Sequence, residues 1–561
     1  MSDRIDRRSF LARGAVAGVG LAAVGTTGGL LAACSSSSGS SSTTSGVSGH
    51  PDGISTATPK AGGALVFGTE AEEQGFDPTT ATFDNTGIMY ARTVFDPLAI
   101  LAANGSVQPY LAQSITANAD YTVWTVTMRP NLLFHDNTPC DAAAVAYNFN
   151  AQKNSLLTGQ SLTTIDTITV TSPLVVTVTM KSPWVPFDYY LAGGIGGQIA
   201  FIAAPSMLKS PQGTTHPVGT GPFVFQEWNV NDHFTATKNP HYWRSGYPYL
   251  DSITYKPIPD PDQLLSSLTS GSVDIMHSDT PNAISTLRSD TSLGYVDDST
   301  NVAGESDMGC LLLNLDKPPF NNLKVRQATA YAISSAQYVK VIDQGIFPTS
   351  NGPFSSNSPY YVADNGYPVY DVSKAKQLVQ EAQQETGQPV SVTVNHVPDP
   401  TTTRIAEYLQ QALQTAGITV TLSPIQQAQI INTALLGTFQ AQVWRQFGAV
   451  DPDMNYIFWS PTNANTPGFS INMARNTDRA MQTALLQGRQ SPNKSDRIAA
   501  YQQVSKLLGS DIPYVWYDRT VWAIGAQPTV ENFDNPTTPA GAKAFGLIGG
   551  AIWPTQIWLN S

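Results

Sequence analysis

The chain has 561 residues, with 30 Lys and Arg against 42 Asp and Glu, which gives a formal net charge of −12. An acidic chain with 13% charged residues lacks the basic stripes with which proteins contact phosphates, so we expect no nucleic-acid partner. The low charge and the 9% aromatic residues argue against a disordered chain, and three cysteines are too few for a disulfide scaffold.

The first 33 residues are typical of an export signal. Four arginines precede an apolar run over residues 14–33, and Arg7-Arg8 resembles the start of a twin-arginine signal. The alternative is a signal anchor that stays as a transmembrane helix, but its many glycines make the run weakly apolar. Removal of residues 1–33 takes away four Arg and two Asp, which changes the net charge from −12 to −14.

Residues 31–34, Leu-Ala-Ala-Cys, resemble the lipobox of bacterial lipoproteins, in which the cysteine carries the lipid. We therefore expect Cys34 to anchor the protein to the extracytoplasmic face of the cell membrane. Residues 34–61 are rich in Ser, Gly and Thr and form a tether. A flexible chain of about 25 residues reaches roughly 25–30 Å.

Strand and helix signals alternate along the rest of the chain. Residues 121–129 alternate at period two, which predicts a strand, and Asp141 is placed to cap a helix that runs to Gln152. Residues 223–228 and 233–238, separated by a short polar turn, predict a hairpin.

The clearest pattern comes in the second half. Alternating residues at 390–394 and 418–422 flank an amphipathic helix at 403–416, with Gly417 as its C′ residue. Such a unit requires two parallel strands and a right-handed crossover. Residues 374–385 predict a further amphipathic helix. The second half is therefore of the α/β class, and the first half is richer in strands and turns.

The sequence offers no set of catalytic residues. It contains no HExxH pair, no Walker A loop and no GxSxG elbow. We therefore expect a protein that is not an enzyme and that holds no cofactor or metal. A metal site assembled from the scattered histidines stays open as an alternative.

Cys140 and Cys310 are the two thiols that remain after lipidation of Cys34. Two separately buried thiols are the preferred interpretation, and a disulfide between these distant positions is the alternative.

Several segments match a single pattern. The chain resembles family 5 of the extracellular solute-binding proteins of ABC importers, which contains oligopeptide-, dipeptide- and nickel-binding proteins. The matching segments are PVGTGPF at 217–223, KNPHYW at 238–243, PYLDSIT at 248–254 and LTSGSVDI at 268–275. Further matches extend the resemblance from about residue 62 to about residue 530.

The resemblance implies an α/β, two-lobed periplasmic-binding-protein-like fold with a hinge and an inserted third subdomain. Two strands would cross between the lobes, near 307–315 and near 514–524. The implied parts are the signal peptide at 1–33, the tether at 34–61, lobe one at 62–306 with an insertion at about 86–195, lobe two at 307–524, and a return to lobe one at 525–561.

The resemblance also implies a function. A peptide would be captured between the lobes and delivered to an ABC permease complex by a monomeric, lipid-anchored protein. The alternative ligand on the same scaffold is a non-peptide solute such as a glycoconjugate, a metal complex or another metabolite. A lipid-anchored hydrolase is a second alternative, which no residue supports.

In peptide-binding members an aspartate of lobe two holds the α-amino group of the peptide. Aligned on Asp451-Pro452, the position of that aspartate falls at about Gly448. Loss of one partner of a buried charge pair costs about 2–5 kcal/mol, which is enough to change the class of ligand or to require another carboxylate. The candidates for that carboxylate are Asp451, Asp453, Glu70, Glu72 and Glu73.

Three neighbouring residues are candidates for ligand contact in lobe two. We predict that Trp444 and Phe447 stack on the ligand and that Arg445 binds a carboxylate. Trp444 could equally pack into the lobe, since half of the residues of an alternating strand do so. Glu70 and Gln74 follow the first strand at its carboxyl end, where α/β sheets bind ligands.

Overall fold

The structure is a computed structural model that describes residues 53–194, 197–300, 304–464 and 468–560. The described residues form one compact unit. The predicted signal peptide, the predicted lipid-attachment residue Cys34 and most of the predicted tether lie outside the described residues. Within the described ranges, no helix combines the length and the apolar character that crossing a membrane requires.

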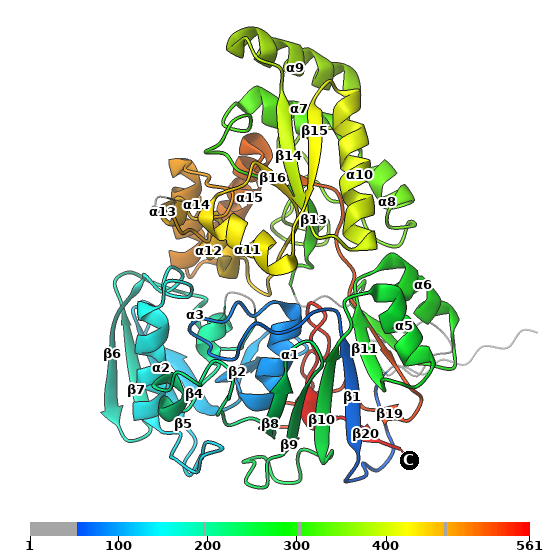
Figure 1. Ribbon diagram of the computed structural model, residues 1–561. Helices are drawn as coiled ribbons and strands as arrows, with labels where there is room; N and C mark the ends of the chain where they lie inside the picture. Colours follow the sequence, from blue (N-terminus) through cyan, green and yellow to red (C-terminus); the bar gives the residue numbers. More distant parts are fainter. Residues whose placement is uncertain (1–52, 195–196, 301–303, 465–467, 561) are drawn as a thin grey trace, which may run out of the picture. The chain divides into compact units, whose positions relative to one another are not determined.

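Among the described residues, the larger sheet has seven strands, and we call the part built on it lobe one (Figure 1). In spatial order the strands are β12 (Gly294–Asp297), β18 (Ala523–Ala526), β11 (Ile275–Ser278), β1 (Ala64–Thr69), β10 (Ser252–Pro257), β9 (His233–Lys238) and β8 (Phe223–Asn229). β1 runs parallel to both of its neighbours, β10 and β11, whereas the outer pairs are antiparallel. The helices of this part are α1 (Asn85–Val94), α4 (Pro205–Leu208), α5 (Pro261–Thr269) and α6 (Pro281–Ser289).

A second sheet, with five strands in the described part of the chain, forms lobe two. Its order is β15 (Thr419–Pro424), β14 (Ser391–His396), β16 (Ala441–Gln446), β13 (Met308–Leu313) and β17 (Tyr514–Trp516). Helices lie around this sheet (Figure 1): α7 (Leu323–Ala332), α8 (Ser335–Val341), α9 (Val372–Thr386), α10 (Pro400–Thr415), α11 (Gln427–Leu436), α12 (Tyr456–Trp459), α13 (Pro461–Ala464), α14 (Arg479–Gln490) and α15 (Lys494–Asp511). β13 is buried on both faces, because Leu311 and Leu313 enter one core cluster while Cys310 and Leu312 enter another.

A third sheet is built from residues 112–180. Its order is β4 (Ala112–Ala117), β5 (Val123–Met128), β7 (Val175–Met180) and β6 (Ile165–Ser172), with α2 (Ala142–Asn154) packed against it. Two short pairs, β2 (Ala99–Leu101) with β3 (Val107–Pro109) and β19 (Val530–Glu531) with β20 (Trp558–Leu559), complete the strands, and α3 (Phe187–Tyr190) follows β7. We call this third sheet with α2 and α3 the insertion.

The local elements predicted from the sequence are confirmed. The 121–129 strand is β5, and Asp141 caps α2 by accepting a hydrogen bond from the Ala144 amide at 3.1 Å. β14, α10 and β15 form the predicted unit of two parallel strands and a helix. Gly417 follows α10 with φ +91°, the left-handed conformation that favours glycine at this position.

The chain connects the two larger sheets twice. It passes from β12 of lobe one to β13 of lobe two, and it returns from β17 of lobe two to β18 of lobe one. These passages fall in the segments that the sequence suggested, while the domain boundaries themselves stay a prediction. Cys140 and Cys310 are both free and buried, as preferred from the sequence.

Candidate functional site

Two carboxylates lie side by side at one edge of lobe one. β1 and β11 are parallel neighbours, with Phe67 opposite Ile275, so their carboxyl ends meet at the same edge of the sheet. Glu70 directly follows β1, and Asp279 directly follows β11. Their side chains are 27% and 20% exposed, so both are reachable from outside the core.

Arg445 of lobe two contacts both of these carboxylates. It lies on β16, opposite Gly309 of β13, and its Nη1 donates to Asp279 while its Nη2 lies 3.4 Å from Glu70 Oε1. Its guanidinium also lies over the ring of Trp522, with Cζ 4.6 Å from the ring centroid. Arg445 therefore joins the two lobes through charge.

Asp307, just before β13, completes this charge cluster. Its Oδ1 accepts a 2.6 Å hydrogen bond from the Gly448 amide, and its Oδ2 accepts from Asn85 Nδ2 at 2.8 Å and Trp522 Nε1 at 3.1 Å. Arg445 Nε lies 3.7 Å from the same Oδ2. The carboxylate is 4% exposed and binds groups from both lobes.

The cluster combines three carboxyl groups with one guanidinium. Burial raises the pKa of Glu70, although Arg445 favours its ionised form, and burial likewise raises the pKa of Asp307 against its three hydrogen bonds. One guanidinium faces three carboxylates, counting Asp279. The arrangement therefore favours the approach of a further cation.

His277 fixes the backbone that carries Glu70. Its Nε2 accepts a hydrogen bond from the Glu70 amide at 3.2 Å, and its Nδ1 lies 3.1 Å from the Gly550 carbonyl. Burial lowers the pKa of His277 to about 4, so the ring is neutral, with Nδ1–H donating to Gly550. In the part of the chain that the structure describes, no group of three or more His, Cys, Asp or Glu side chains is arranged to hold a metal ion.

A mainly apolar cavity lies against residues 444 and 447. Trp444 and Phe447 line it from lobe two, and Phe83, Asp84 and Leu162 line it from the other side. Phe447 also contacts Phe458, with ring centroids 5.7 Å apart. The two predicted stacking residues therefore border the same cavity, and both are also partly packed against the core of lobe two.

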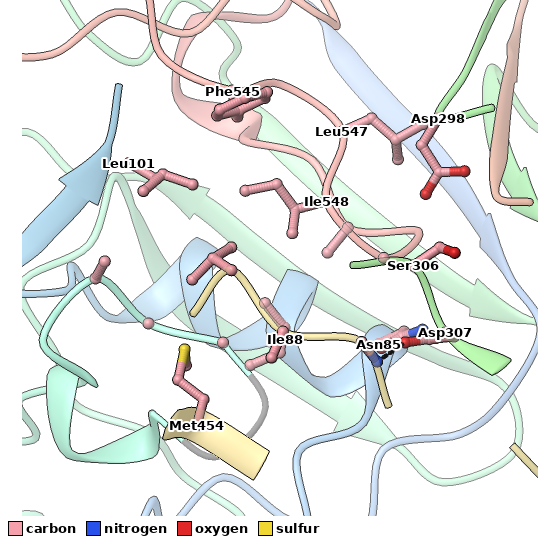
Figure 2. Close-up of a pocket in the computed structure, with 18 of the residues that line it drawn as sticks. Asn85, Ile88, Leu101, Asp298, Ser306, Asp307, Met454, Phe545, Leu547 and Ile548 are labelled. Carbon is pink, nitrogen blue, oxygen red and sulfur yellow. Dashed lines mark hydrogen bonds between the residues drawn. The ribbon is translucent and has the colours of Figure 1, made fainter. Parts of the chain in front are cut away.

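A second cavity lies next to Gly448 (Figure 2). Asn85 and Ile88 of α1 line it, together with Met454 of lobe two and Leu547 and Ile548 near the chain end. Arg92, one helical turn beyond Ile88, lines it as well, so we call it the Arg92 cavity. Both cavities have walls from lobe one and lobe two.

Gly448 has no room for a side chain. A Cβ atom built there would lie 2.0 Å from the Glu305 carbonyl oxygen and 2.9 Å from the Asp307 amide nitrogen. The position that the resemblance assigns to an amine-binding aspartate is therefore filled by the backbone that leads into β13. The nearest carboxylate is that of Asp307, which sequence reasoning missed, although it starts the predicted crossover.

Asp451 has a partner away from both cavities. Its two oxygens accept from Arg497 Nη2 at 2.8 and 2.9 Å, and Oδ1 also accepts from the Asp453 amide. Asp453 pairs with Arg489, whose Nε lies 2.9 Å from Oδ1, and both side chains are fully buried. As a ligand residue Asp451 stays a prediction, and its position in the structure indicates a structural role.

The other predicted residues near Glu70 lie apart from one another and from the charge cluster in the structure. Gln74 is exposed and lines neither cavity. Glu72 accepts from Trp228 Nε1 and from the Asn231 amide, both at 2.6 Å, and Glu73 is buried beside α1. Only Glu70 of this segment reaches the charge cluster; Gln74 as a ligand residue stays a prediction.

Comparison with known proteins adds a family match. The model of the family described as "bacterial extracellular solute-binding proteins, family 5 Middle" matches residues 106–468. The glutathione-binding protein GsiB of Pectobacterium atrosepticum is 26% identical over 421 residues, which cover 72% of this chain and 79% of that protein. The nickel-binding periplasmic protein of Escherichia coli is 28% identical over 384 residues, which cover 64% and 71%.

A solved structure has the same fold. The periplasmic binding protein DppA from Helicobacter pylori, in complex with the peptide STSA, superposes with a TM-score of 0.78 at 22% identity. The superposition covers 90% of this chain and 99% of DppA. The expectation of a two-lobed periplasmic-binding-protein fold is therefore confirmed.

Proposed function

Since the chain belongs to family 5 of the bacterial extracellular solute-binding proteins, we propose that it captures a peptide between its lobes and delivers it to an ABC permease. The family consists of extracytoplasmic binding proteins that serve ABC importers and are not enzymes. The peptide, the lipid anchor at Cys34 and the monomeric state are parts of the proposal.

One observation carries the proposal: Arg445 of lobe two binds Glu70 and Asp279 of lobe one, and neighbouring residues of its segment line two cavities. Separation of the lobes would break these contacts and open both cavities at once. A site that opens and closes in this way suits transient capture and release of a solute.

The chemistry of the site suits a peptide. The excess of carboxylates around Arg445 attracts an ammonium group, and the apolar cavity offers Trp444 and Phe447 to an apolar side chain. Trp444, Arg445, Phe447 and Glu70 are therefore the proposed ligand residues. Among the similar proteins, DppA is described with a bound peptide and GsiB as binding glutathione, whereas the E. coli relative is described as binding nickel. A non-peptide solute on the same scaffold is the second candidate.

Two measurements on the purified protein test the ligand. Native mass spectrometry would identify a solute that co-purifies, and thermal unfolding with a dipeptide and tripeptide library would detect binding. A peptide at a hundredfold excess over its Kd stabilises the protein by about 2.7 kcal/mol. A co-purified non-peptide together with a library that gives no shift would refute the peptide proposal.

Membrane attachment is tested through Cys34. The Cys34→Ala variant is expected in the soluble fraction after cell lysis, whereas the wild type stays with the membrane. Cys140→Ala is the matched control, because Cys140 is a buried thiol of the folded body. Equal membrane attachment of the wild type and Cys34→Ala would exclude the lipid anchor.

A further inference from the structure

Arg92 is a buried cation for which the described residues supply no counter-anion. Its side chain lies on α1 and is 3% exposed, and its guanidinium stacks on Trp553 with Cζ 4.4 Å from the ring centroid. The hydrogen bond described for it is a long one, from Nη1 to the Ala551 carbonyl at 3.4 Å. Among the described residues, Arg92 Nε has no acceptor and no carboxylate pairs with the guanidinium.

A second donor next to it is also unsatisfied. Trp553 Nε1 is buried and has no acceptor within the described part of the chain. Arg92 and Trp553 both line the Arg92 cavity. Buried donors in proteins are almost always paired, and a buried charge without a partner is costly, so two such groups on one cavity indicate an acceptor that binds there. Burial also lowers the pKa of Arg92 to about 10, which reflects the same cost.

The wall of the cavity also carries carboxyl groups. Asn85, Ile88 and Arg92 lie on one face of α1, and seven residues of helix separate the first from the last by about 10.5 Å. Asn85 donates to Asp307, and Asp298 also lines the cavity, beside Leu547 (Figure 2). The cavity wall therefore carries a guanidinium and two carboxyl groups, and burial raises the pKa of both carboxyl groups, that of Asp298 well above its usual value.

We propose that Arg92 and Trp553 bind the carboxylate of a zwitterionic solute whose ammonium end faces Asp298 and Asp307. A singly charged carboxylate fits better than a phosphate, because a second negative charge would be repelled by the two aspartates. This proposal rests on the proposed function and specifies the solute: it carries both charges, as a short unblocked peptide does.

The stability of the ligand-free protein separates a binding role from a structural one. If Arg92 serves a ligand, Arg92→Met removes a buried unpaired charge and leaves the melting temperature equal or higher. If Arg92 holds the fold, the melting temperature falls. Arg129→Met is the matched control, because Arg129 also stacks on a tryptophan, Trp243, but lies outside the cavity.

Peptide binding tests the carboxylate directly. For each library peptide, the free acid and its C-terminal amide are compared by thermal shift with the wild type, Arg92→Met and Arg129→Met. The wild type and Arg129→Met are expected to bind the acids at least tenfold more tightly than the amides, and Arg92→Met is expected to lose that preference. Equal binding of acids and amides by the wild type would overturn the inference and leave the proposed function intact.

Acetate tests the anion site even if no peptide binds. At equal ionic strength, sodium acetate is expected to raise the melting temperature of the wild type more than sodium chloride does, and this difference should vanish in Arg92→Met. An acetate effect without peptide binding would support the anion site and refute the peptide. Identical acetate effects in the wild type and Arg92→Met would overturn the inference, and Arg92→Gln serves as the variant if Arg92→Met does not fold.

Discussion

The Asp453–Arg489 pair offers the sharpest test of the packing between lobe two and the insertion. Both side chains are fully buried. Asp453 Oδ2 also accepts from Trp184 Nε1 of the insertion at 2.8 Å, and Arg489 stacks on Trp184 and on Tyr456, at 4.4 and 3.7 Å from their ring centroids. Although burial opposes its charge, Asp453 raises the pKa of Arg489 above its usual value.

Asp453→Asn would leave this guanidinium buried without an anion. Loss of one partner of a buried pair costs about 3–5 kcal/mol, which is the expected fall in the free energy of unfolding. Trp184→Phe removes a hydrogen bond to a charged group, worth about 1.5–3 kcal/mol, and also shrinks the buried ring on which Arg489 stacks. Both variants are therefore expected to lower the free energy of unfolding.

Guanidinium chloride unfolding, followed by circular dichroism, measures both effects. A double-mutant cycle with Arg489→Met isolates the interaction energy between Asp453 and Arg489 from their other contacts. Removal of both charges should cost less than the two single changes added together. A loss below about 1 kcal/mol for Asp453→Asn, or strict additivity with Arg489→Met, would refute the view that this buried pair is tightly coupled.

Three further predictions concern the contact between the lobes and the response to pH. Arg445→Met leaves three carboxyl groups facing one another, so the lobes of the ligand-free protein should separate and its radius of gyration in X-ray scattering should rise. Lys324→Met, which removes an exposed ion pair, is the control. Equal radii of gyration for Arg445→Met and the wild type would contradict a role of Arg445 in holding the lobes together. Gly448→Ala places a Cβ against the Glu305 carbonyl, so the affinity for the co-purified solute should fall at least tenfold by calorimetry, and unchanged affinity would argue against the contact. Burial raises the pKa of Asp96 to about 7, so the folded state binds this proton more tightly than the unfolded chain does. The free energy of unfolding should therefore fall by up to about 4 kcal/mol as the pH rises from about 4 to 7. Asp96→Asn should reduce that fall in urea unfolding at pH 5 and pH 7.5, and an unchanged pH dependence would contradict it.

Local sequence signals predicted the elements well. Asp141 capped the expected helix, and β14, α10 and β15 appeared where alternation and helical spacing placed them. These features depend on neighbouring residues, so periodicity and capping chemistry suffice to find them. The family motifs added the two lobes, which no local pattern could predict.

The partners of the site residues could not be predicted in the same way. Arg445 was a candidate from the sequence, but its partner Asp279 lies 166 positions away and becomes a neighbour only because the two lobes meet in the folded chain. Asp451 shows the converse, since Arg497, 46 positions further on, takes both of its oxygens. A carboxylate next to a site and one inside a structural ion pair look alike in sequence.

Gly448 and Asp307 together suggest how this chain departs from the peptide-binding pattern that it resembles. The resemblance puts an aspartate at about position 448, where the structure has an amide that donates to the Asp307 carboxylate and no space for a side chain. A carboxylate is thus kept at this place, but it comes from the passage between the lobes. Because Asp307 also binds Asn85 of lobe one, a ligand ammonium that reached it would contact the segment about which the lobes move, and so would couple its binding directly to closure.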